Sequence, residues 1–178
     1  MPITKNLPYY LLALGLFLSL KFCFTIADNN TLTFLLYPTD KLVSLITGSQ
    51  SVYFPDNGYY HEKLNIVIDK SCSGFNFWVL GFLVFAYLGL QYFDKHVHKM
   101  LTLPTALTFA YLLTIFANTS RIFASIVVQH QTAKIFSGKQ YLIHEAVGII
   151  TYLSFLILAY YLIEKFLTHR RHAKLTSS

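Results

Sequence analysis

Residues 69–93 read DKSCSGFNFWVLGFLVFAYLGLQYF and decide the fold, because a short polar stretch gives way there to a long apolar one. No charged residue occurs from Ser73 to Phe93. A helix needs about 20 apolar residues to cross the hydrocarbon core of a bilayer. The run therefore predicts a transmembrane helix over residues 73–93, and Cys72, one of only two cysteines in the chain, directly precedes it.

The rest of the chain repeats this pattern. With 54% hydrophobic and 12% charged residues, the composition excludes an ordinary soluble domain, which averages about 25% charged residues. Three further runs reach the length of a span: residues 7–27, 101–121 and 143–163. We therefore expect an all-α integral membrane protein with about four transmembrane helices in a single membrane domain, residues 1–178. The first run is read as a span rather than a signal peptide, because it exceeds the usual 7–15 apolar residues and no small-residue cleavage site follows Ala27. Lys21, inside this run, is expected to extend its amine toward the headgroups.

Lysine and arginine in short loops indicate the orientation. With the N-terminus in the cytoplasm, the cytoplasmic side carries Lys5, Lys95, Lys99, Lys165, Arg170, Arg171 and Lys174, and the outer side carries Lys41, Lys63, Lys70, Lys134 and Lys139. We therefore expect both termini in the cytoplasm of a multi-pass protein of the cell inner or plasma membrane, with residues 28–72 and 122–142 extracytoplasmic. The net charge of +6 is mostly a topology signal, and no basic face with stacking aromatics indicates nucleic-acid binding.

The first extracytoplasmic segment holds two predicted elements. TLTFLLYPTDKLVSLIT, residues 31–47, is too short and too interrupted to cross, so it predicts a re-entrant or interfacial piece. SVYF-PDNG-YYHEKLNIVID, residues 51–69, has two runs rich in aromatic and β-branched residues around a Pro-Asp-Asn-Gly turn, which predicts a small extracytoplasmic β-hairpin.

Three ionisable residues meet on the outer side of the predicted membrane. Cys72 precedes the second span, Arg121 ends the third, and His144 lies in the first outer turn of the fourth. Ionisable groups at membrane depth are costly and usually functional. A thiol, a guanidinium and an imidazole at similar depth would make a cysteine acyl-transfer site, with a nucleophile, an oxyanion stabiliser and an acid/base.

Four neighbours support these three residues. Ser73 is expected to cap the second span, and Gly74 to let a substrate backbone approach the sulfur. Asn118 shares a helix face with Arg121 and could orient it. Gly148, four residues after His144, permits close helix packing.

These residues carry a family resemblance. The ordered set Cys72-Ser73-Gly74, Asn118-x-x-Arg121-Ile122 and His144-x-x-x-Gly148 resembles the exosortase/archaeosortase family, over residues 48–163. Many family members have more spans, so the chain resembles a short, four-span exosortase-like variant.

The resemblance implies a cysteine transpeptidase or protease with Cys72 as nucleophile, Arg121 as transition-state stabiliser and His144 as acid/base. It implies a substrate that is an exported protein with a C-terminal motif, a transmembrane helix and a basic tail. It implies no cofactor.

Other interpretations of the same residues remain open. Cys23 and Cys72 could form a disulfide in an oxidising compartment. No metal site is predicted, although Cys72, His144 and a further outer histidine could bind a metal weakly. A non-catalytic membrane assembly or partner subunit would use the Cys, Arg and His groups to hold helices together. A transporter is disfavoured because no charge lies near the midplane.

Overall fold

The computed structural model describes residues 3–93, 95–132 and 140–176, with side chains described for 6–93, 95–128 and 145–169. Within these ranges the elements are α1 Ile3–Ile26, α2 Thr33–Thr47, β1 Val52–Phe54, β2 Gly58–His61, the 3₁₀ turn η1 Glu62–Leu64, β3 Ile66–Ile68, the 3₁₀ turn η2 Lys70–Cys72, α3 Phe75–Tyr92, α4 His96–Thr132 and α5 Gln140–Thr176.

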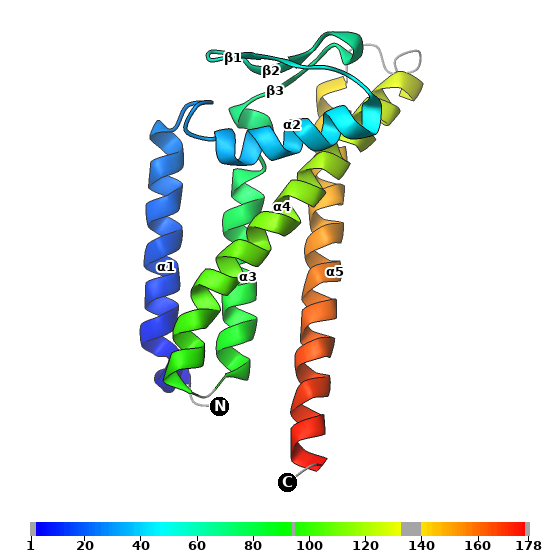
Figure 1. The fold of residues 1–178 in the computed structure, drawn as a ribbon. Helices are drawn as coiled ribbons and strands as arrows, with labels where there is room; N and C mark the ends of the chain where they lie inside the picture. The colour runs from blue at the N-terminus through cyan, green and yellow to red at the C-terminus, as the bar shows by residue number, and fades with distance from the viewer. Residues whose placement is uncertain (1–2, 94, 133–139, 177–178) are drawn as a thin grey trace.

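Four of these helices, α1, α3, α4 and α5, are long and apolar enough to cross a membrane, which confirms the predicted number of apolar helices. The start of α1 and the end of α5 lie at one end of the bundle, which we call the terminal end (Figure 1). The β-strands and α2 lie at the other, which we call the sheet end.

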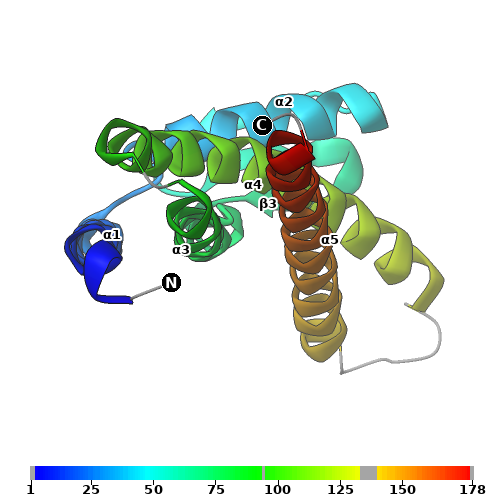
Figure 2. The ribbon, with the colours of Figure 1, turned by 90° about the horizontal axis from the view of Figure 1, so that it is seen from below.

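Helix α3 forms the centre of the bundle. Viewed along the helices, it lies between α1 and α5 and against α4 (Figure 2). Its Val79, Phe82 and Leu90 side chains are fully buried, and the Trp78 indole donates a hydrogen bond to the Leu107 carbonyl of α4 at 3.0 Å. Helix α5 has few buried residues by comparison, so a small number of contacts fixes its position.

The segment that the sequence predicted to be re-entrant or interfacial forms helix α2. It lies across the sheet end, over α3 and α4, and does not run parallel to the long helices (Figure 1). Leu35, Leu36 and Val43 are buried beneath it, whereas Tyr37 and Leu45 are exposed. The Tyr111 hydroxyl donates to the Phe34 carbonyl at 2.7 Å and ties α2 to α4.

The turn into α2 is closed by Asp28. Its Oδ1 accepts hydrogen bonds from the Thr31 hydroxyl at 2.6 Å and from the Thr31 N–H at 2.7 Å. Both bonds favour the ionised carboxylate, and they hold the pKa of Asp28 below its usual value.

The predicted hairpin is present, and a third strand extends it. Strands β1 and β2 pair antiparallel around the turn at residues 55–57. Gly58, at φ +87°, lies so close to the Ile68 carbonyl that a Cβ would not fit. Strand β3 then pairs with β2 in an antiparallel three-stranded sheet. The sequence analysis read residues 59–69 as one run, which η1 and Asn65, at φ +50°, divide into β2 and β3.

A buried polar triplet fastens α2 to the sheet. His61 Nε2 lies 2.9 Å from Asp40 Oδ1, and His61 Nδ1 lies 3.1 Å from Ser49 Oγ. Asp40 and His61 are fully buried, and Ser49 is 2% exposed. A charge inside a protein needs such a partner, so the triplet fixes how the sheet sits on α2.

The helix ends differ from the predicted span boundaries. Helix α4 continues through Arg121 to Thr132, and α5 begins at Gln140 and ends at Thr176. A single charge does not end a helix, and no glycine or proline occurs between Pro104 and Gly138. Arg121 therefore lies within a continuous helix rather than at its end.

Lys21 has a side-chain partner on α3. Its Nζ donates to Asn76 Oδ1 in the first turn of α3 at 2.7 Å, and lies 5.8 Å from the centre of the Phe24 ring. The amine thus joins α1 to α3 close to Cys72.

Candidate active site

Cys72 is the last residue of η2, two residues before the N-cap of α3. The Asp69 carboxylate holds this turn, because its Oδ1 accepts hydrogen bonds from the N–H groups of Ser71 and Cys72 at 3.0 and 3.3 Å. The Ser71 hydroxyl lies 3.7 Å from Cys72 Sγ. Cys72 is partly exposed. Its thiol lies next to a hydroxyl, on a turn whose backbone is held by hydrogen bonds.

Asn118 binds the backbone of Cys72 from α4. Its Nδ2 donates to the Cys72 carbonyl at 2.5 Å, and its side chain is fully buried. The Tyr152 hydroxyl of α5 donates to Asn118 Oδ1 at 2.6 Å. This chain of hydrogen bonds joins α3, α4 and α5 at the turn that carries the thiol.

Arg121 lies one turn further along α4. Its Nη1 donates to the Tyr152 hydroxyl at 3.4 Å, and its guanidinium lies 5.5 Å from the centre of the Tyr152 ring. A Cβ on Gly148 would lie 2.9 Å from Arg121 Nε, so a larger residue there would require the Arg121 side chain to shift. The expectation that Gly148 permits close packing agrees with this geometry.

Gly74 and Ser73 shape the backbone at the start of α3. Gly74 is the N-cap of α3 at φ +71°, where a Cβ would lie 3.0 Å from Thr114, 3.3 Å from Asn118 and 3.3 Å from the Tyr152 hydroxyl. Its lack of a side chain therefore makes room for α4 and α5. Ser73 precedes the N-cap instead of occupying it, although its Oγ accepts a hydrogen bond from the Phe75 N–H at 3.3 Å.

The backbone of His144 lies in α5, one turn before Gly148. Residues four apart share one side of a helix, so α5 brings this position toward the side that contacts Arg121. The side chain of His144 lies outside the described residues.

A pocket of about 750 Å³ opens beside these groups at the sheet end. Its charged lining residues are Asp69, Lys70, Arg121 and Glu145. Ser71, Ser73 and Gly74 form its wall near Cys72, and Cys72 itself is not among the lining residues. The thiol thus lies next to the pocket, flanked by residues that line it.

The structure adds residues that the sequence analysis did not select. Tyr152 bridges Asn118 and Arg121, Asp69 caps the cysteine turn, and Glu145 lines the pocket. Tyr152 follows Gly148 by four residues and His144 by eight, and this helical spacing was the available signal. No comparable spacing in the sequence marked Asp69 or Glu145.

The alternative uses of the cysteines find no support in the described geometry. Cys23 and Cys72 are both free thiols, and Cys23 is exposed. Among residues whose side chains are described, no group of three His, Cys, Asp or Glu side chains could hold a metal ion.

Comparison with known proteins identifies no relative: no family model, no curated protein and no solved structure matches this chain.

Proposed function

We propose that this chain is a membrane-embedded cysteine transpeptidase or protease of exosortase-like type. One observation carries the proposal: Asn118 of α4 donates to the Cys72 carbonyl and is itself bound by Tyr152 of α5, beside a pocket that also contains a guanidinium. A site of this kind, with a nucleophile, a cation and a place for a substrate, suits acyl transfer.

The proposed reaction begins with attack of the Cys72 thiolate on a peptide carbonyl carbon. The new C–S bond gives a tetrahedral intermediate, and Arg121 stabilises its oxyanion. His144 takes the thiol proton and gives it to the leaving amine as the C–N bond breaks. An acceptor amine or water then attacks the thioester and regenerates the thiol. Because Cys72 lies beside the pocket, its side chain must rotate toward the pocket when substrate binds, as side chains readily do.

The proposed substrate is an exported protein with a C-terminal motif, a transmembrane helix and a basic tail. Its helix would lie along α3 between α1 and α5, where the pocket is walled by Phe24 of α1, Leu80 of α3 and Ile149 of α5. In this proposal the sheet end faces the extracytoplasmic side of the cell membrane, and both termini are cytoplasmic.

The chemistry is tested by replacing the two cysteines separately in cells that make the protein. Cys72→Ser should lower processing of the substrate by at least about 100-fold, because loss of a nucleophile removes the covalent step. Cys23→Ser is the matched control and should leave processing unchanged. The readout is the intact mass of exported proteins before and after replacement.

A second measurement looks for the thioester itself. Trapped acyl-enzyme should appear as a mass adduct on Cys72 that hydroxylamine releases, and it should be absent from the Cys72→Ser protein. Normal processing by Cys72→Ser would refute the enzyme.

The hydrogen-bonded network also suits a non-catalytic membrane assembly subunit, because Asn118 binds the backbone of Cys72 and not its thiol. In that case Cys72→Ser is harmless, whereas Asn118→Leu lowers the amount of protein in the membrane. Comparing these two variants separates the two functions.

A further inference from the structure

A second cavity, of about 440 Å³, lies in the terminal half of the bundle. We call it the terminal-end crevice. It is lined by Phe85, Gly89 and Phe93 of α3, by His98, Leu101, Thr102, Thr105, Ala106 and Phe109 of α4, and by Ile163, Phe166 and Leu167 of α5. None of these residues lines the pocket beside Cys72, so the crevice is a separate feature.

The dimensions of the crevice fit one extended alkyl chain. Along α4 it runs from His98 to Phe109, a rise of about 17 Å at 1.5 Å per residue. A helix about 10 Å across would need roughly 1,300 Å³ over that length. An alkyl chain about 4–5 Å across would need only about 280 Å³, because carbon atoms pack about 3.5–4.0 Å apart. The observed volume therefore suits an acyl chain better than a whole transmembrane helix.

The walls of the crevice are suited to hydrocarbon. Its two threonines have satisfied hydroxyls, since Thr102 Oγ1 donates to the His98 carbonyl and Thr105 Oγ1 to the Leu101 carbonyl, each at 2.8 Å. Apart from His98, the remaining lining residues are apolar. Apart from His98, these walls offer little to a polar ligand, whereas an acyl chain would bury apolar surface against them.

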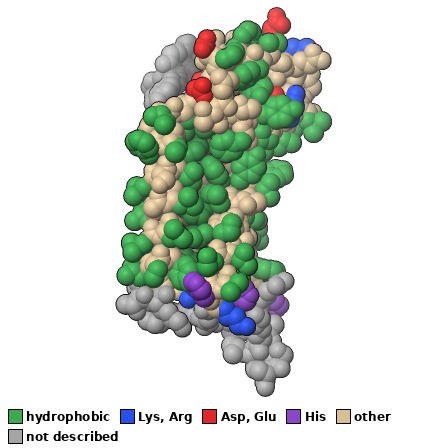
Figure 3. All heavy atoms as spheres, turned by 60° about the vertical axis from the view of Figure 1, so that its left-hand side comes forward, with side chains coloured by type: hydrophobic (Ala, Val, Ile, Leu, Met, Phe, Trp, Pro, Cys, Tyr) green, Lys and Arg blue, Asp and Glu red, His purple; other side chains and the backbone are tan. Residues whose placement is uncertain are grey.

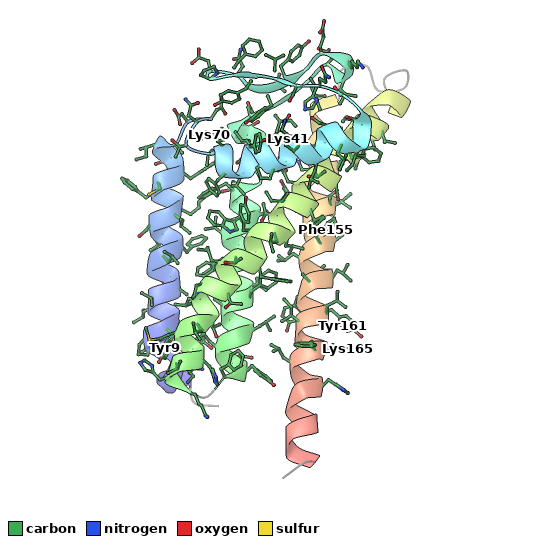
Figure 4. The ribbon with its side chains drawn as sticks, in the orientation of Figure 1. Tyr9, Lys41, Lys70, Phe155, Tyr161 and Lys165 are labelled. Carbon is green, nitrogen blue, oxygen red and sulfur yellow. The ribbon has the colours of Figure 1, made fainter. Side chains whose placement is uncertain are left out.

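Basic residues lie next in sequence to the lining of the crevice: Lys95 is two residues after Phe93 and Lys165 directly precedes Phe166. His98 lies at the mouth, and Lys95 and Lys165 are exposed at the same end, where Figure 4 shows Lys165 on α5. Lys99 is already bound, because its Nζ donates to Asn6 Oδ1 at 2.6 Å. An acidic residue, Glu164, directly precedes Lys165 in α5. On the face shown in Figure 3, histidine side chains gather at the terminal end, acidic ones appear at the sheet end, and Lys and Arg side chains appear at both ends.

We propose that the terminal-end crevice binds one acyl chain of an anionic phospholipid, whose phosphate lies beside His98. The chain fills the space between α5 and the α3–α4 pair, which helix contacts leave open. This site does not depend on the proposed chemistry, and the Cys72→Ser protein should bind the lipid as well as the wild type does.

The test uses the full chain in nanodiscs that contain equal amounts of phosphatidylglycerol and phosphatidylcholine with the same acyl chains. Native mass spectrometry after transfer to mild detergent counts the retained lipid. The expected result is one lipid per chain, with phosphatidylglycerol favoured at least about three-fold, a preference near 0.65 kcal/mol. Equal retention of the two lipids, or no retention, would overturn the proposal.

A pair of threonine variants on α4 locates the lipid. Thr105 lines the crevice and Thr108 does not, both are exposed, and each hydroxyl donates to a carbonyl of its own helix. Thr105→Phe should reduce retention about ten-fold, a loss of about 1.4 kcal/mol, and Thr108→Phe should not. Equal retention in the two variants contradicts the assigned site.

A crosslinking experiment on the unmodified chain avoids any folding defect in the variants. Phosphatidylglycerol with a diazirine on its acyl chain should crosslink to peptides that contain residues 85–93, 98–109 or 163–167. Crosslinks confined to other segments would overturn the proposal.

Discussion

At the scale of single residues, Tyr152 does more than its position in an apolar helix indicates. Its hydroxyl donates to Asn118 and accepts from Arg121, and its ring stacks on Phe77 of α3 with centroids 4.7 Å apart. Because α5 buries few residues, this side chain is a principal anchor of the helix that carries His144.

Replacing Tyr152 with phenylalanine should therefore keep the stacking and remove the hydrogen bonds. Buried Asn118 Oδ1 then loses its donor, which should cost about 1–3 kcal/mol of unfolding free energy and lower substrate processing. Thermal unfolding in nanodiscs measures the first effect. Tyr161→Phe is the matched control, since Tyr161 lies on the same helix and is exposed. Equal unfolding temperatures for the two variants would contradict the anchoring role.

At the scale of elements, α2 and the sheet form one unit through Asp40, His61 and Ser49. The His61 and Asp40 side chains lie 2.9 Å apart and are fully buried, where screening by water is weakest. The sequence analysis assigned His61 no role, because neither partner is near it in the chain.

Breaking this pair should loosen the sheet from α2. His61→Ala leaves the Asp40 carboxylate buried without its partner, which should cost about 3–5 kcal/mol. Asp40→Asn retains an acceptor for His61 Nε2 and should cost only about 1 kcal/mol. Hydrogen exchange of residues 52–68 reports the effect. If these amides exchange as slowly in the His61→Ala protein as in the wild type, the pair does not fasten the sheet to α2.

At the scale of the whole molecule, the two ends of the bundle differ in chemistry. The sheet end holds the candidate active site, and the terminal end holds the starts of α1 and α4, the end of α5 and the crevice (Figure 1). The proposed orientation places the sheet end outside the cytoplasm, so the two ends should meet different solvents.

Single cysteines test this orientation. In a protein with Cys23→Ser and Cys72→Ser, we expect Asn57→Cys, in the exposed turn of the sheet, to react with a membrane-impermeant maleimide in intact cells. Lys95→Cys, exposed at the terminal end, should react only after the membrane is permeabilised. The opposite pattern would reverse the orientation and place the candidate active site in the cytoplasm.

Local patterns in the sequence were sufficient to predict the long helices and the hairpin. Apolar runs predicted four helices of spanning length, and a Pro-Asp-Asn-Gly turn predicted the hairpin, because hydrophobic length and turn chemistry are properties of neighbouring residues. The same patterns did not separate β3 from β2 or predict the extension of α4 past Arg121.

Sequence patterns alone predicted four apolar helices of spanning length, a shorter segment between the first two and a hairpin, and they selected Asn118 and Arg121 as groups near Cys72. Only the tertiary structure decided that Asn118 binds the Cys72 carbonyl, that Tyr152 joins Asn118 to Arg121, and that Lys21 binds Asn76. The physical reason is distance along the chain. These hydrogen bonds join residues 31–55 positions apart, and their geometry depends on how the helices pack.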